Sequence, residues 1–183
     1  MSRSLSLTAV LVAVLTVVAV AGCGGAAVTG PGGATSTAVV AYASGQSLAR
    51  LDPARLPDTS AAVTALLARM PATVAGHART SSTTREVHYA DGSAFTVAPL
   101  SEAAPGRSMP AFFTAFAGSG QFTVTGKNVD GAPVLWFVGT STAPDKHDVA
   151  AAASSAGSWL FGVDATSPAA ADEIVAGFTA ALG

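Results

Sequence analysis

Residues 86–97, EVHYADGSAFTV, decide the fold class that the sequence predicts. Apolar side chains fill every second position on both sides of Asp91-Gly92, namely Val87, Tyr89, Phe95 and Val97. A period of two is typical of a strand with one face on a core, and Asp-Gly is favoured in the shortest turns between antiparallel strands. The stretch therefore predicts a β-hairpin closed by a type I′ turn, in which both central residues have positive φ.

Residues 122–138 repeat this plan. Phe122 and Val124 alternate with polar residues, Asp130-Gly131 supplies a second turn, and VLWFV follows at 134–138. Because this run is apolar at every position, it indicates a strand covered on both faces, or a rim strand whose outer face is used. We expect a second hairpin here and a further strand over residues 158–163, SWLFGV.

Three segments have the caps and the spacing of helices. The first begins in the N-cap cluster Asp58-Thr59-Ser60 and the other two follow a Ser, and each carries apolar residues at intervals of three and four. The helices are expected over residues 59–70, between Ser108 and Gly118, and after Ser167-Pro168, with Ile174, Phe178 and Leu182 as the apolar stripe of the last.

Together these elements predict a single α+β domain over residues 38–183, with an antiparallel sheet of about five strands and two or three packed helices. Val39, Val40 and Tyr42 are expected to form a short strand or an extended lead-in. Residues 144–156 are expected to form a loop, in which the alanine run at 150–153 makes a helical turn.

The first 23 residues predict export. Arg3 gives a short positive head, residues 5–21 carry no charge, and small residues lead to Cys23, the single cysteine of the chain. These are the parts of a secretory signal peptide. Val20-Ala21-Gly22-Cys23 resembles the lipobox of bacterial lipoproteins, which is an aliphatic residue, a small residue, Gly or Ala, and then Cys.

The resemblance implies that the Cys23 thiol receives a diacylglyceryl group and that cleavage between Gly22 and Cys23 removes a signal peptide of residues 1–22. Two acyl chains anchor a protein stably where one would be marginal. The membrane is then a partner through Cys23, and the expected location is the extracytoplasmic face of the cell membrane. The alternatives are that residues 5–21 remain as an uncleaved membrane helix, or that Cys23 is an ordinary thiol.

A tether is predicted after the anchor, so that residues 23–37 comprise the lipidated Cys23 and a linker. Residues 24–37 read GGAAVTGPGGATST, with no charge and no aromatic side chain. This composition is typical of a flexible linker. The alternative is an ordered glycine loop packed on the domain.

Composition excludes several classes of protein. A chain that is 50% hydrophobic and 11% charged is not disordered over its whole length. A net charge of −2 excludes a nucleic-acid binder with a broad basic surface and argues against general attraction to anionic headgroups. One cysteine excludes an internal disulfide and a cysteine-rich zinc site.

The chain is similar to small Ala-rich lipoproteins of high-GC Gram-positive bacteria, and its strand–strand–helix ending resembles LolA-like lipid carriers.

No catalytic motif stands out in the sequence. The segment Gly139-Thr140-Ser141-Thr142-Ala143 lacks the last glycine of a hydrolase elbow, and no phosphate-binding or dinucleotide-binding glycine loop occurs. His77, His88 and His147 are not spaced as a helical metal pair, and His88 is expected to face solvent from a strand. His147 could bind a metal together with Asp145 or Asp148, and His147 with Asp148 comes nearest to a catalytic pair, but the segment reads as a solvated loop tip. We therefore expect no cofactor, no metal and no enzymatic activity.

Five aromatic residues are the remaining candidates for a site: Phe112, Phe113, Phe116, Trp136 and Trp159. They either pack in the core or line an apolar cavity between the sheet and the Phe-rich helix. Three functional hypotheses follow. The first is a non-catalytic domain that binds an envelope protein or serves as an accessory. The second is a carrier of a lipid or small apolar ligand, and the third is a hydrolase-type enzyme that uses His147 and Asp148.

Overall fold

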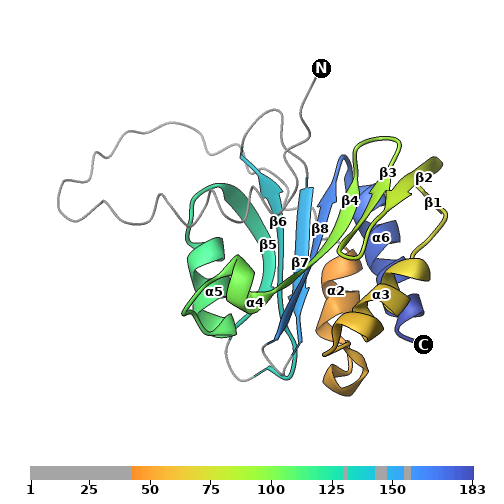
Figure 1. Cartoon of the computed structure of the whole chain (residues 1–183). Helices are drawn as coiled ribbons and strands as arrows, with labels where there is room; N and C mark the ends of the chain where they lie inside the picture. The colour runs from red at the N-terminus through yellow and green to blue at the C-terminus, as the bar shows by residue number, and fades with distance from the viewer. Residues whose placement is uncertain (1–42, 130–131, 143–147, 155–157) are drawn as a thin grey trace, which may run out of the picture.

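The computed structural model describes residues 43–129, 132–142, 148–154 and 158–183, and for residues 148–153 it describes the backbone alone. The α+β class is confirmed (Figure 1). The helices are α2 (Ala43–Ala49), α3 (Ser60–Ala68), α4 (Leu100–Ala103), α5 (Met109–Ala117) and α6 (Pro168–Ala181), with a 3-10 turn η1 (Pro53–Arg55). The strands are β1 (Thr73–Val74), β2 (His77–Ser82), β3 (Glu86–Tyr89), β4 (Ala94–Pro99), β5 (Phe122–Asn128), β6 (Leu135–Ser141), β7 (Asp148–Ala153) and β8 (Trp159–Ala165).

The strands that the structure describes form one sheet in the order β1-β2-β3-β4-β8-β7-β6-β5. Every neighbouring pair is antiparallel. The two expected hairpins are therefore present as β3–β4 and β5–β6, and β8 and β7 join them at the centre of the sheet. The turn at Asp130-Gly131 lies outside the described residues.

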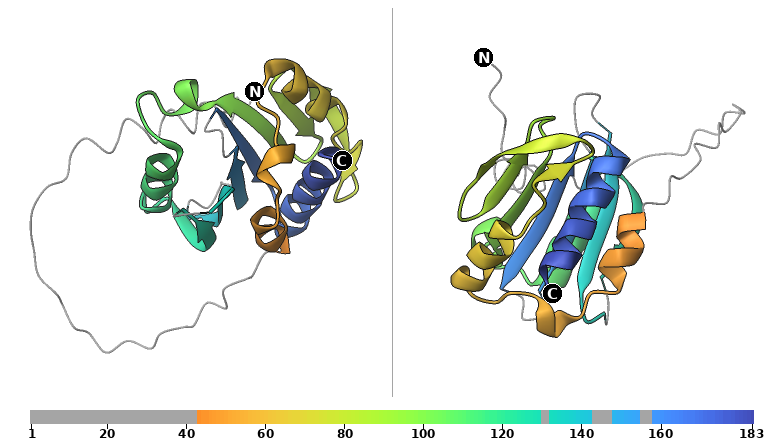
Figure 2. Two further views of the ribbon diagram at one scale, coloured as in Figure 1. Left: turned by 90° about the horizontal axis from the view of Figure 1, so that it is seen from below. Right: turned by 90° about the vertical axis from the view of Figure 1, so that its right-hand side faces the viewer.

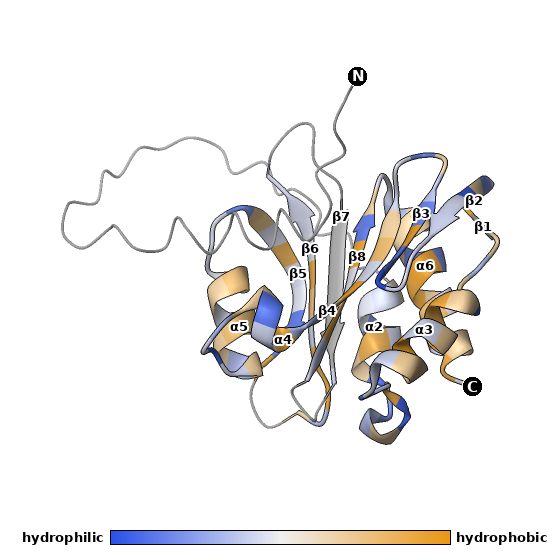
Figure 3. Ribbon diagram, viewed as in Figure 1, coloured by the Kyte–Doolittle hydropathy of each residue, from blue (hydrophilic) through white to orange (hydrophobic). Residues whose placement is uncertain are grey.

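Helices cover both faces of the sheet. Helices α2, α3 and α6 lie on one face and α4 and α5 on the other, with α6 between α2 and α3 (Figures 1 and 2). Each face has its own core: Phe95, Phe161 and Phe178 pack on the α6 side, and Phe113 and Phe137 on the α5 side. Apolar residues gather where α5 and α6 meet the sheet (Figure 3).

Strand β6 confirms the two-faced interpretation of the VLWFV run. Leu135 and Phe137 belong to the core under α5, whereas Val138 belongs to the core under α6 and Trp136 packs against it. Successive side chains of a strand point to opposite faces, so an unbroken apolar run suits a strand between two helical layers.

The predicted helices are also confirmed, and each has the expected N-cap. The hydroxyls of Thr59, Ser108 and Ser167 accept hydrogen bonds from backbone N–H groups in the first turns of α3, α5 and α6. In α6, Ile174 and Phe178 are buried and Leu182 is partly buried, as the stripe predicts.

The β3–β4 turn differs from the type I′ turn that Asp91-Gly92 suggested. Gly92 has φ of 94°, but Asp91 is not among the described residues with positive φ. The N–H of Gly92 donates to the Tyr89 carbonyl, and the N–H of Tyr89 donates to the Ser93 carbonyl. Three residues, 90–92, therefore form the loop, with Gly92 in the left-handed position that such loops use.

A two-residue turn of the I′ kind occurs instead between β1 and β2, at Ala75-Gly76. The φ angles there are 47° and 81°, and Val74 pairs directly with His77. Ala75 is the one non-glycine residue with positive φ in the described chain. The N–H of Ala75 donates to Glu173 Oε2 of α6 at 2.6 Å, which ties this turn to the last helix.

One expectation about the sheet is wrong. Residues 148–153 form β7, not a loop with a helical turn, and their backbone pairs with both β6 and β8. Alanine favours helices in isolation, but the two open strand edges beside this segment outweigh that preference. The sheet also includes β1 and β2, which the sequence did not predict; β2 (HARTSS) has no apolar alternation to signal it. The predicted lead-in at residues 39–42 lies outside the described residues.

Candidate binding pocket and the predicted site residues

The predicted lipidation site lies outside the part of the chain that the structure describes. Gly22, Cys23 and the linker all precede Ala43, where the description begins. None of the helices in the described ranges is long and apolar enough to cross a membrane.

The five aromatic residues do not share a cavity, because the sheet separates them. Phe112, Phe113 and Phe116 belong to the core under α5, where Phe113 is 1% exposed. Trp159 belongs to the core under α6, and Trp136 packs against the same core. The sequence could not separate them, because it did not reveal that α5 covers the face of the sheet opposite to the one on which both tryptophans lie.

The three phenylalanines of α5 pack ring against ring. Phe116 stacks on Phe122 with a centroid distance of 4.9 Å and meets Phe137 edge-on at 4.7 Å. Phe112 contacts both Phe113 and Phe116, at 5.5 and 5.8 Å. Contacts at these distances are those of a filled aromatic core.

Each tryptophan has a structural role. The Trp159 indole N–H donates to the Asp58 carbonyl at 2.9 Å and so links β8 to the segment before α3. The Trp136 ring occupies space that Gly126 leaves open, because a Cβ at Gly126 would lie 2.5 Å from the ring. Among the described residues, Trp136 Nε1 and Ser44 Oγ are buried and have no hydrogen-bond partner.

The histidines that the structure describes do not assemble a metal site. His147 lies outside the described residues, and only the backbone of Asp148 is described. His88 is not simply solvent-facing: 30% of its side chain is exposed, and Nε2 lies 3.0 Å from Glu86 Oε2. Within the described ranges, no three His, Cys, Asp or Glu side chains are grouped to hold a metal ion.

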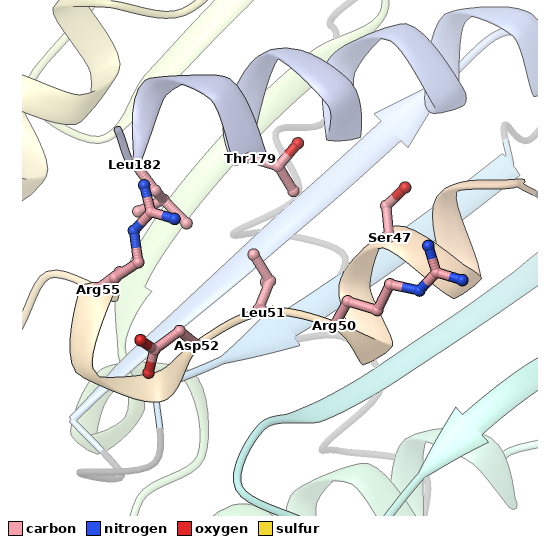
Figure 4. Close-up of a pocket in the computed structure, with 7 residues that line it drawn as sticks. All are labelled: Ser47, Arg50, Leu51, Asp52, Arg55, Thr179 and Leu182. Carbon is pink, nitrogen blue, oxygen red and sulfur yellow. The ribbon is translucent and has the colours of Figure 1, made fainter.

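A pocket of about 230 Å³ lies between the end of α2, η1 and the last turn of α6 (Figure 4). Its lining residues are Ser47, Arg50, Leu51, Asp52, Arg55, Thr179 and Leu182. Leu51 lies between the two arginines, and Thr179 and Leu182 reach the pocket from α6 (Figure 4). Sequence reasoning missed this site, because its residues come from opposite ends of the domain.

Local sequence explains how the pocket wall forms. Asp52 precedes Pro53, and its Oδ1 accepts the N–H of Ala54 at 3.0 Å, which caps η1. Proline suits the first turn of a helix because it has no N–H to leave unpaired there. Asp52-Pro53 was therefore the one signal in the sequence for this wall. The turn places Arg50 and Arg55 at opposite ends of the pocket (Figure 4).

The pocket has an excess of positive charge. In the described part of the chain, the guanidinium groups of Arg50 and Arg55 make no hydrogen bond and no ion pair, whereas Arg85 pairs with Glu102. Asp52 supplies the one carboxylate of the lining. Two arginines and one aspartate leave a net charge of +1, in a chain whose overall charge is −2.

A second polar group, around Asp91, serves the fold. Asp91 Oδ2 accepts the hydroxyls of Thr166 at 2.6 Å and Ser93 at 2.7 Å, and Oδ1 accepts the Ser93 N–H at 3.0 Å. Partial burial raises the pKa of Asp91, but the hydrogen bonds from Thr166 and Ser93 and the nearby His77 together hold it below the ordinary value. These bonds join the β3–β4 turn to the end of β8.

Comparison of the chain with models of protein families, with curated proteins and with solved structures gave no match.

Proposed function

We propose that this protein is an exported lipoprotein, held at the extracytoplasmic face of the cell membrane by a diacylglyceryl thioether on Cys23. The observation that carries the proposal is Val20-Ala21-Gly22-Cys23 at the end of an apolar stretch of residues 5–21. The absence of any second cysteine in the sequence supports it, because an exported chain with one thiol has no wrong disulfide to form.

The domain beyond the tether is proposed to be a non-catalytic binding or accessory module of the cell envelope. Two features support this: the aromatic residues that are described pack in filled cores, and one of the two described histidines, His88, bonds a carboxylate on its own strand. The carrier alternative has less support, because the five residues expected to line its cavity lie on opposite faces of the sheet.

Replacement of the cysteine tests the anchor. Cys23→Ser is expected to abolish lipid labelling and membrane retention, while the native chain begins at residue 23 and carries the mass of a diacylglyceryl group. The matched control is Cys23→Ser with Ala27→Cys, which keeps one thiol but moves it out of the lipobox and should remain unlabelled. Retention of Cys23→Ser in the membrane without lipid would show instead that residues 5–21 are an uncleaved anchor.

Native mass spectrometry tests the role of the domain. The Cys23→Ser protein, purified from the envelope without detergent, is expected to have the mass of the bare polypeptide. A reproducible excess that extracts as an intact lipid would overturn the accessory assignment in favour of a carrier. If the accessory assignment is right, crosslinking of the native chain in cells should capture an envelope protein.

A further inference from the structure

The arginine pocket has the composition of a binding site for an oxyanion. Arg50 and Arg55 are exposed, and neither is neutralised by a partner in the described chain. The Ser47 hydroxyl donates to the Ala43 carbonyl at 3.5 Å, the limit of a hydrogen bond, so it can turn toward a ligand at little cost. A guanidinium group presents paired N–H donors that match the oxygens of a phosphate.

The pocket also has apolar surface. Leu51 lies between the two arginines, and Leu182 closes the α6 side (Figure 4). The aliphatic stems of the arginines extend this surface, because long cationic side chains keep only their heads in water. The pocket therefore suits a phosphate that is carried on a carbon backbone better than a free inorganic ion.

The position of the pocket matters for a tethered protein. α2 has 7 residues and so is about 10 Å long, which places Arg50 that far from the point where the linker enters the domain. The predicted flexible linker, residues 24–37, has an end-to-end distance of roughly 20 Å. A short flexible tether gives millimolar effective concentrations, so weak binding to a headgroup suffices to orient the domain.

We propose that the pocket formed by Ser47, Arg50, Leu51, Arg55 and Leu182 binds a phosphate ester. Under the proposed function, the phosphate is that of an anionic phospholipid headgroup beside the anchor or of a soluble phosphate ester, and the two sources share this chemistry. Binding is local, because a chain with a net charge of −2 has no general attraction to an anionic surface.

The test uses the full mature protein with its lipid anchor. Ala49→Cys places one reactive thiol on an exposed position of α2, and the thioether at Cys23 does not compete for a thiol-reactive fluorophore. Intact mass measured first establishes whether Cys23 carries lipid, so failure of the anchor is recognised separately. Emission is then followed during titration with glycerol phosphate in neutral detergent, and in phosphatidylcholine vesicles with and without phosphatidylglycerol.

A saturable change with glycerol phosphate, or a change specific to phosphatidylglycerol vesicles, is expected. Each of Arg50→Gln and Arg55→Gln should weaken it about tenfold. Arg107→Gln removes the same charge from the loop between α4 and α5 and should leave it unchanged. A change with glycerol phosphate only would identify a soluble ester as the ligand. A change with phosphatidylglycerol vesicles only would identify a lipid headgroup. No change in either arm, or an equal loss in Arg107→Gln, overturns the proposal.

Discussion

Asp91 shows how one carboxylate can hold two distant parts of this chain together. Its three hydrogen bonds reach Ser93, which is fully buried, and Thr166, 75 positions away along the chain. Hydrogen bonds to a charged group stabilise a fold more than neutral ones do. The Asp-Gly pair predicts a turn, but the aspartate also bonds Ser93 and Thr166 and so joins the turn to the end of β8.

The pKa of Asp91 gives a prediction about pH. A carboxyl whose pKa is lower in the folded state stabilises the fold above its unfolded pKa, near 3.8, and loses that contribution as pH falls through the lower folded value. Asp91→Ala should therefore lower the free energy of unfolding by about 1–2 kcal/mol at pH 7. Urea titrations should show the difference from the native chain shrinking below pH 4. The exposed Asp58→Ala is the control; a difference that persisted unchanged at pH 2 would contradict the charge assignment.

At the scale of elements, the β1–β2 turn contains a residue that is poorly suited to its backbone. A residue other than Gly, Asn or Asp is destabilised by roughly 1–2 kcal/mol in the left-handed region, and Ala75 has φ of 47°. The bond from its N–H to Glu173 and the pairing of Val74 with His77 hold the turn in place. The site thus offers a stabilising substitution.

Ala75→Asn should raise the free energy of unfolding by about 0.5–1 kcal/mol, because Asn-Gly is the pair that this turn type prefers. Chemical denaturation measures the gain. Ala90→Asn is the matched control, since Ala90 lies in the neighbouring turn with an ordinary negative φ and should gain nothing. A loss of stability in Ala75→Asn would mean that the turn is not of the I′ kind.

Elements with their own local signal were predictable from the sequence, and those without it were not. Caps and apolar spacing located α3, α5 and α6, and alternation located β3 and β4. The strands β2 and β7 depend on their neighbours: HARTSS and DVAAAA become strands because adjacent edges are available to pair. The arginine pocket shares that limitation, because Leu51 and Leu182 meet only after the last helix packs.

At the scale of the whole molecule, one sheet carries two cores, and both tryptophans lie in the same one. The fluorescence of Trp136 and Trp159 follows unfolding of the α6-side core, whereas far-UV circular dichroism follows unfolding of all helices and strands. A mutation on the α5 side therefore shows whether the two layers unfold together. Domains of this size usually unfold in a single cooperative step.

Phe113→Leu, at a position 1% exposed, should cost about 1–1.5 kcal/mol and shift the urea midpoint equally by tryptophan fluorescence and by circular dichroism. Thr114→Ala, exposed on the same helix, should shift neither by more than about 0.5 kcal/mol. If the urea midpoint measured by tryptophan fluorescence stayed unchanged while the midpoint measured by circular dichroism fell, the two layers would be independent folding units.

The contact between the first and last described helices sets the timing of folding. The Ser44 N–H donates to Asp172 Oδ1 across 128 positions, and α2 also packs on β6, which is made late. At roughly 5–20 residues per second, Asp172 is synthesised roughly 6–25 s after Ser44. A helix of 7 residues does not persist alone for that time. Helix α2 is therefore completed only after α6 has been synthesised, so the N-terminal end of the described domain folds last. Under the proposed function, Cys23 would then be processed while the segment that follows the linker is still unfolded.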